Sequence, residues 1–306
     1  RETDVRVSVI PMLHGENVVL RLLDRGREVL SISDLEIPES QEQQFMEMIK
    51  RPNGMILITG PTGSGKTTTL YSALNAIRDQ SIKIVTIEDP VEYSLPGIHQ
   101  IQVHEKIGRT FSNGLRSILR HDPDVVLVGE IRDKETAQSA VQASLTGHLV
   151  LSTLHTNDAC GAVSRLVDMG VEPFLVASTL RGVMAQRLVR KLCSHCRKQV
   201  SASEIELPND YPEPDGKLYV ATGCRRCHQL GYQGRLPIFE LLTCDHSIRQ
   251  MAAKGADAGT LRQHASSLGM KSLRDCGWSA VAQGKTTVDE ILRLTGVSSD
   301  STESFG

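Results

Sequence analysis

The chain has 306 residues, and its 34 basic and 36 acidic side chains leave a formal net charge of −2. A chain of this length holds about two domains. The balanced charge and an aromatic content of only 4% argue against a nucleic-acid partner, because nucleic acids bind at basic patches and stack on aromatic side chains. No apolar run approaches the ~20 residues of a membrane-spanning helix, and we expect no signal peptide.

The beginning of the chain predicts two β-strands, at residues 5–10 and 18–23. Two strands are too few for a stable unit, and the sequence starts at Arg1 without Met. We therefore interpret residues 1–23 as the remnant of an N-terminal domain and expect the chain to be a fragment of a longer protein. Residues 24–38 are then a linker.

The strongest motif begins at Gly60 and ends at Thr67, and it fits the pattern G-x-x-x-x-G-K-[ST]. An apolar run at residues 55–58 precedes it, and a segment with helical spacing follows it at residues 68–77. A strand, a glycine loop and a helix together favour a phosphate site. The backbone N–H groups of the loop can point into one concavity, and the N-terminus of the helix adds partial positive charge. A Gly/Ser-rich turn without function is the competing interpretation.

This motif supplies the candidate residues for nucleotide binding. They are Gly60, Pro61, Thr62, Gly63, Ser64, Gly65, Lys66 and Thr67. We expect the Lys66 ammonium to reach the β- and γ-phosphates and the Thr67 hydroxyl to ligate magnesium.

The part of the chain around this loop alternates between helices and apolar strands. Helices are predicted at residues 39–50, 110–120, 134–145 and 158–169, and further strands at residues 82–87, 125–128 and 149–151. Such alternation is typical of an α/β fold with a parallel sheet covered on both faces. Ligands in these folds bind beyond the carboxyl ends of the strands.

Acidic residues lie next to two of the predicted strands. Asp124 precedes the strand at residues 125–128 and Glu130 follows it, whereas Glu88 opens the acidic segment 88–92 at the end of another strand. A carboxylate at a strand tip beside a phosphate loop holds magnesium or polarises the attacking water. We favour Glu88 as the residue that orients or deprotonates this water, and Glu130 is the alternative. Solvated loop carboxylates are the competing interpretation.

Two histidines flank the strand predicted from residue 149. A lone histidine is more often structural than functional, but His155 follows the strand where a γ-phosphate would lie. We expect His155 to contact that phosphate, and we leave His148 open between a structural and a functional role.

Four of the seven cysteines form two C-x-x-C pairs, 27 residues apart. They are Cys193, Cys196, Cys224 and Cys227. Four thiolates in this pattern favour a closed, tetrahedral structural Zn²⁺ site and a reducing compartment, with unrelated thiols as the alternative. We expect a zinc-binding module at residues 191–235 and a helical subdomain at residues 236–306, with breaks at Gly255, Gly269 and Gly284.

Four segments together resemble the signature motifs of the secretion ATPase superfamily. They are residues 60–67, 86–92, 119–133 and 147–157, which look like its Walker A motif, Asp box, Walker B motif and His box. The likeness runs over nearly the whole chain, and residues 141–148 and 168–175 look closest to the E proteins of type II secretion. The pilus assembly ATPases are near neighbours. In the family's G-R-x-G-I-x-E motif, at residues 234–240, Pro237 stands in place of the second glycine.

This resemblance implies a RecA-like P-loop NTPase core at residues 39–190, with ATP and Mg²⁺ as ligands. It implies a homo-hexameric, ATP-hydrolysing motor of type II secretion that drives pseudopilus assembly. It further implies a cytoplasmic protein held peripherally at the inner membrane by partner secretion components, which bind an N-terminal region that this sequence lacks. A pilus-extension ATPase, a nucleic-acid translocase and a nucleotide-dependent switch with little turnover are the alternatives.

The resemblance also assigns roles to five arginines. Arg6 and Arg21 match arginines with which the N-terminal domain completes the site in this family, and both lie in otherwise apolar strands. Arg116, Arg120 and Arg132 match arginines of the family's core. Solvated surface charges are the competing interpretation for all five.

Overall fold

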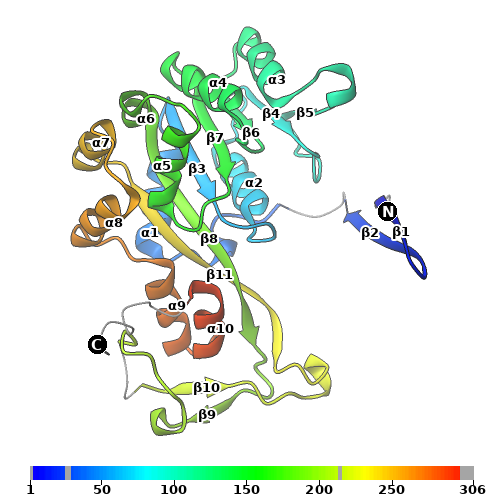
Figure 1. Cartoon of the computed structure of the whole chain (residues 1–306), viewed down its shortest axis with the longest axis vertical. Coiled ribbons are helices and arrows are strands. Elements are labelled where there is room, and N and C mark those ends of the chain that lie inside the picture. The colour runs from blue at the N-terminus through cyan, green and yellow to red at the C-terminus, as the bar shows by residue number, and fades with distance from the viewer. Residues whose placement is uncertain (1–2, 25–28, 213–215, 297–306) are drawn as a thin grey trace.

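The computed structural model describes residues 3–24, 29–212 and 216–296. Its centre is a seven-stranded sheet in the order β11-β8-β3-β7-β6-β4-β5 (Figure 1). The strands are β3 (Gly54–Thr59), β4 (Ile84–Glu88), β5 (His99–Gln102), β6 (Val125–Val128), β7 (Leu149–Leu154), β8 (Leu180–Leu192) and β11 (Tyr232–Thr243). All neighbours pair in parallel except β11, which runs antiparallel to β8. The predicted α/β fold with a parallel sheet is therefore confirmed, with one antiparallel edge strand added.

Helices cover both faces of this sheet because its central strands alternate their side chains between two apolar layers. On β3, Ile56 and Ile58 pack with helices α1 (Glu39–Ile49) and α2 (Lys66–Ile77). Met55 and Leu57 face the opposite layer. That layer holds α3 (Phe111–Ile118), α4 (Lys134–Leu145), α5 (Ala159–Asp168) and α6 (Pro173–Thr179). The predicted helices are thus confirmed to within a few residues at each end.

Local side chains explain where three of these helices begin. Thr110, Asp133 and Asp158 each precede a helix, and each accepts a hydrogen bond from the backbone N–H three residues later. Such N-caps satisfy N–H groups that have no partner inside the helix. The start of each helix beside the sheet is therefore encoded locally.

Strands β8 and β11 leave the central sheet together and reach a small sheet of β9 (Lys198–Val200) and β10 (Leu218–Val220) (Figure 1). The sequence did not indicate either long strand, because polar side chains interrupt their apolar pattern. The predicted boundary between residues 235 and 236 falls inside β11. Pro237 lies opposite Leu188 on this edge strand, where a missing N–H can face away from the sheet.

Four short helices end the described chain, as predicted. They are α7 (His246–Ala253), α8 (Ala258–Ser267), α9 (Leu273–Ala282) and α10 (Val288–Thr295). Gly255, Gly269 and Gly284 all have positive φ, of 73°, 94° and 64°. Glycine adopts this left-handed conformation without steric cost, which is why the chain turns at these points.

Strands β1 (Thr3–Met12) and β2 (Gly15–Asp24) form a separate hairpin, as expected from the two apolar stretches. Its apolar side chains are exposed, with Val7 and Leu20 both at 59%.

Part of the predicted linker packs on the core, because Ile32 and Leu35 join the layer of α1 and α2. Residues 25–28 of that linker lie outside the described residues. Within the described ranges, none of the helices combines the length and the apolar character needed to cross a membrane.

Candidate active site and candidate metal centre

A cavity of about 770 Å³ lies at the carboxyl ends of the central parallel strands. Its lining comes from the loop before α2 and from the ends of β4, β6 and β7, and it includes Lys66, Thr67, Glu88, Glu130 and His155. Segments separated by many residues therefore meet at the edge of the sheet where the sequence placed them. The cavity also takes Gln186 and Leu188 from β8, which the sequence analysis did not anticipate.

The phosphate loop connects β3 directly to α2 and needs its glycines. A Cβ atom at Gly60 would lie 2.4 Å from the carbonyl oxygen of Gln186, and one at Gly65 would lie 2.7 Å from the Gln186 amide nitrogen. Both glycines also have positive φ, of 148° and 92°. No side chain caps α2, so the N–H groups of its first turn face the loop. The buried Ser64 hydroxyl has no hydrogen-bond partner among the described residues. Such a loop fits an anion.

Lys66 lies at the wall of this cavity. Its ammonium donates hydrogen bonds to the carbonyl oxygens of Gly60, at 2.8 Å, and Pro61, at 3.0 Å. Burial lowers the pKa of Lys66, and the negative charge of Glu130 opposes that effect. The cation and the carboxylate both line the same cavity.

Glu130, Arg132 and His155 form one polar group at the cavity. The Glu130 carboxylate accepts a hydrogen bond from Arg132 Nε at 2.6 Å and lies 3.4 Å from His155 Nε2. The side chain of Glu130 is only 13% exposed, whereas that of His155 is 47% exposed. Glu130 and His155, which the sequence analysis treated separately, are therefore neighbours at this cavity.

Glu88 lies at the same cavity but is deeply buried, with 3% of its surface exposed. Its carboxylate accepts hydrogen bonds from the hydroxyl of Tyr71, from Thr86 Oγ1 at 2.5 Å and from Gln100 Nε2 at 3.2 Å. Burial raises the pKa of Glu88, and these hydrogen bonds oppose the rise. Three donors thus hold the carboxylate at the end of β4.

Two candidate residues lie at the opposite, amino ends of the strands. The Asp124 carboxylate accepts from the backbone N–H of Lys83 at 2.7 Å. His148 Nδ1 lies 2.9 Å from the carbonyl oxygen of Ala143. The expectation of a carboxylate beside the phosphate loop therefore holds for Glu130 and is wrong for Asp124. His148 contacts α4 from the amino end of β7 and does not line the cavity.

The five arginines that match the family's motifs lie in different parts of the structure. Arg132 lines the cavity. Arg120 lies beyond α3, where its Nη1 donates to the carbonyl oxygen of Arg116 at 3.0 Å, and neither residue lines the cavity of its own chain. Arg6 and Arg21 occupy paired positions on β1 and β2, and their side chains lie outside the described part of the structure.

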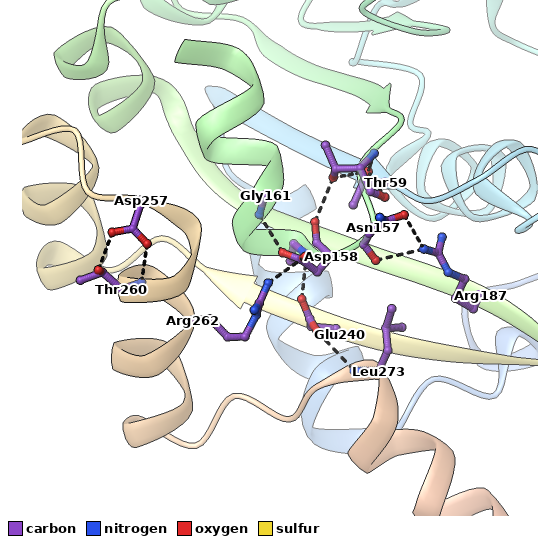
Figure 2. Close-up of polar contacts among 12 residues, drawn as sticks. Thr59, Asn157, Asp158, Gly161, Arg187, Glu240, Asp257, Thr260, Arg262 and Leu273 are labelled. Carbon is purple, nitrogen blue, oxygen red and sulfur yellow. Dashed lines mark hydrogen bonds and ion pairs between the residues drawn. The ribbon is translucent and has the colours of Figure 1, made fainter. Parts of the chain in front are cut away.

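The segment after His155 is fixed by a polar network that joins it to β3, β8, β11 and α8 (Figure 2). The hydroxyls of Thr59 and Thr156 lie 2.7 Å apart. Arg187 Nη2 donates to the carbonyl oxygen of Asn157 at 3.1 Å. Asp158 caps α5 and also forms an ion pair with Arg262 at 2.8 Å. The position of His155 is thus tied to the strand that precedes the phosphate loop.

Glu240 completes this network from β11 (Figure 2). Its buried carboxylate accepts from the backbone N–H of Ala159 at 2.7 Å and from that of Leu273 at 3.3 Å, so it caps the starts of α5 and α9 together. The sequence offered one signal for it, because Glu240 ends the G-R-x-G-I-x-E segment. No local signal marked Arg187 or Arg262.

The four predicted zinc ligands converge at the far end of β8. Their Sγ atoms all lie within 4.8 Å of one another, with Cys193 and Cys224 at 3.9 Å and Cys196 and Cys227 at 3.8 Å. A tetrahedron of Zn–S bonds separates its sulfurs by about 3.8 Å, so the donor set fits one zinc ion. The backbone N–H groups of Cys224 and Gly231 donate to Cys227 Sγ, both at 3.2 Å. The other cysteines, Cys160, Cys244 and Cys276, are buried apart from this cluster.

Comparison with known proteins places this architecture among secretion proteins. A family model described as type II/IV secretion system protein matches residues 1–293. Type II secretion system protein E of Pseudomonas aeruginosa is 52% identical over 297 residues, which cover 96% of this chain and 59% of that protein. Type II secretion system ATPase E of Vibrio cholerae is 50% identical, with coverages of 96% and 59%. The type IV pilus assembly ATPase PilB of Myxococcus xanthus is 48% identical, with coverages of 96% and 53%.

Solved structures share the fold. The pilus retraction motor PilT with bound ADP superposes with a TM-score of 0.71 at 28% identity, over 95% of this chain and 74% of that chain. The ATPase DotB of Legionella pneumophila superposes with a TM-score of 0.69 at 22% identity, over 95% and 72% of the two chains. This chain spans about 59% of the length of the E proteins named above. By its sequence and its fold, the chain belongs to the type II/IV secretion system protein family.

Proposed function

We propose that this chain carries the ATPase core of a motor for type II protein secretion, which drives pseudopilus assembly through inner-membrane partners. The observation that carries the proposal is the cavity in which Lys66, Thr67, Glu88, Glu130 and His155 meet. Relatives at 50% and 52% identity bear the names of type II secretion ATPase E and protein E. The ADP reported with PilT supports a nucleotide as the ligand.

Each residue at the cavity has a proposed role in hydrolysis. Lys66 and the loop N–H groups hold the phosphates, and Thr67 together with Glu130 would hold Mg²⁺, which would offset the charge on the β- and γ-phosphates. Glu88 orients or deprotonates the attacking water. His155 contacts the γ-phosphate and shares a polar contact of 3.4 Å with Glu130. Glu130 as the base is the competing assignment.

The domain-level mechanism assigns Arg6 and Arg21 to the closing face of an N-terminal domain. A γ-phosphate contacted from both sides would hold the two domains together, and hydrolysis would release them. The exposed apolar side chains of the hairpin, such as Val7 and Leu20, are consistent with a larger domain that covers them. A homo-hexamer would pass successive closures to membrane partners, and we expect this assembly in the cytoplasm at the inner membrane.

The cysteine cluster is proposed as a structural zinc site. Its four thiolates would complete a tetrahedron and leave no open position for chemistry.

A pilus-assembly ATPase is the second candidate function, because PilB is 48% identical to this chain. Expression of this protein in a strain that lacks its type II secretion ATPase, and in one that lacks its pilus-assembly ATPase, would separate the two functions. Restored secretion would support the first function, and restored pilus extension would support the second.

Hydrolysis by two carboxylate variants tests the proposed site. Glu88→Gln should bind ATP normally and lose turnover, because the amide keeps the shape but cannot accept a proton. Glu130→Gln should weaken the dependence on Mg²⁺. Glu135→Gln, at an exposed position on α4, is the matched control.

Normal turnover by Glu88→Gln, together with normal Mg-ATP binding by Glu130→Gln, would reverse the two roles. Rates measured over a range of protein concentrations report whether hydrolysis requires assembly. A chain that hydrolyses no ATP at any concentration would contradict the proposed function.

A further inference from the structure

Tyr71 joins the helix of the phosphate loop to the acidic segment at residues 88–92. Its side chain on α2 is fully buried. The hydroxyl donates a hydrogen bond to Glu88 Oε2 and accepts one from the backbone N–H of Glu92 at 3.4 Å. A single hydroxyl therefore contacts both ends of the acidic segment.

The ring of Tyr71 is held as firmly as its hydroxyl. It packs edge-on against Tyr93, with ring centroids 4.6 Å apart and an angle of 80° between the rings. Such edge-to-face pairs add to the stabilisation from burial. The hydroxyl thus points to Glu88 from a ring with little freedom to turn.

The other oxygen of the Glu88 carboxylate is also occupied. Thr86 Oγ1 donates to Oε1 at 2.5 Å, and Gln100 Nε2 donates to the same atom at 3.2 Å. Gln100 in turn donates to the carbonyl oxygen of Tyr93 at 3.2 Å and accepts from the N–H of Leu95 at 2.7 Å. Strands β4 and β5 therefore hold one side of the carboxylate, and α2 holds the other.

We propose that Tyr71 is a positioning residue that fixes the Glu88 carboxylate relative to Lys66. Both Tyr71 and Lys66 belong to α2, so a rigid helix sets the separation between the ammonium on the phosphate loop and the base. Loss of the hydroxyl frees one carboxylate oxygen and removes a donor that favours the ionised form. This inference rests on the proposed function, because it concerns the hydrolytic role of Glu88.

The pH dependence of ATP hydrolysis by the full chain tests this role. Tyr71→Phe keeps the ring and removes the hydroxyl. We expect kcat to fall about 10- to 100-fold, because the lost hydrogen bond is to a charged group. ATP affinity should be unchanged. The acid limb of the pH–rate profile should move up by about one pH unit, because a base with one donor fewer has a higher pKa.

Tyr71→3-fluorotyrosine sharpens the test with little change in shape. Fluorine makes the hydroxyl a stronger donor, so the acid limb should move to lower pH. Opposite shifts for the two variants cannot arise from a general loss of packing. Tyr232→Phe is the matched control, because it removes a hydroxyl that lies 2.9 Å from Thr287 Oγ1, outside the nucleotide cavity.

Three outcomes would overturn the inference in distinguishable ways. If the unsubstituted chain shows no magnesium-dependent hydrolysis, both the proposed function and this inference are wrong. If the chain is active and Glu88→Gln is equally active, Glu88 is not the base and Tyr71 has no base to position. If Glu88→Gln is inactive but both Tyr71 variants keep the wild-type rate and acid limb, only the role of Tyr71 is wrong.

Discussion

Strand β8 joins two regions of the molecule that are stabilised differently. Near the cavity, Gln186 in the middle of β8 lies so close to Gly60 and Gly65 of the phosphate loop that neither could carry a Cβ atom, and the neighbouring strands β3 and β7 are buried at every position. Beyond the carboxyl end of β8, Cys193 joins a cluster next to two strands of three residues each. Burial of apolar surface shapes the first region, whereas the second has few apolar side chains to bury. We therefore expect loss of a phosphate contact to change activity in the first region, and loss of the proposed zinc ion to change folding in the second.

Replacement of Lys66 should give the largest effect and leave the fold intact. Lys66→Ala removes the point charge that we propose to contact the β- and γ-phosphates, so we expect it to abolish ATP turnover. The thermal unfolding midpoint should stay at the wild-type value, because the apolar layers around β3 do not involve this ammonium. Lys83→Ala, at an exposed position at the amino end of β4, is the control. Near-normal hydrolysis by Lys66→Ala would rule out the proposed site.

Removal of the proposed zinc ion at the far end of β8 should have the opposite effect, because we expect it to disrupt local folding and to leave ATP binding intact. Structural zinc contributes roughly 10–16 kcal/mol to small zinc-binding peptides, so the module should lose its structure without the ion. We expect one zinc per chain by metal analysis. In Cys193→Ser we expect rapid proteolytic cleavage between residues 193 and 231, with ATP binding retained. Cys276→Ser, outside the cluster, should keep the metal. Purified protein without zinc would contradict the assignment.

The smallest expected effect concerns Glu290, which joins α10 to strand β8 near its carboxyl end. Its side chain is 0% exposed and pairs with Arg190 of β8 at 2.7 Å and with Arg293 at 2.8 Å. Burial alone would raise the pKa of Glu290, but hydrogen bonds from Arg293 and Arg190 outweigh it and lower the pKa to about 2. The resulting stability is therefore present above the ordinary value of 4.5 and is lost as the pH falls toward 2.

We expect Glu290→Gln to lower the free energy of unfolding by about 2–3 kcal/mol at pH 7. The difference from the wild type should shrink as the pH falls from about 4.5 toward 2, as measured by denaturant unfolding at each pH. Glu39→Gln, at an exposed position on α1, is the control. A stability difference that does not change over this pH range would show that the ion pair does not act through its charge.

The sequence alone determined the βα order, the phosphate loop and the paired cysteines, because each depends on short-range spacing. Glycines at fixed positions between an apolar run and a helical segment predict a phosphate loop without any distant contact. Capping residues such as Asp133 and Asp158 mark the starts of helices in the same local way. These features required no knowledge of which strands become neighbours.

Tertiary structure alone decided the contacts between segments distant in the chain. It separated Glu130 from Asp124 and His155 from His148, because the direction of a strand in the sheet determines which of its ends faces the cavity. It brought Tyr71 and Gln100 to Glu88, and it placed Glu240 where two helices begin. Buried polar groups require partners, but the sequence does not state which ones, since only packing of the whole chain brings their donors and acceptors together.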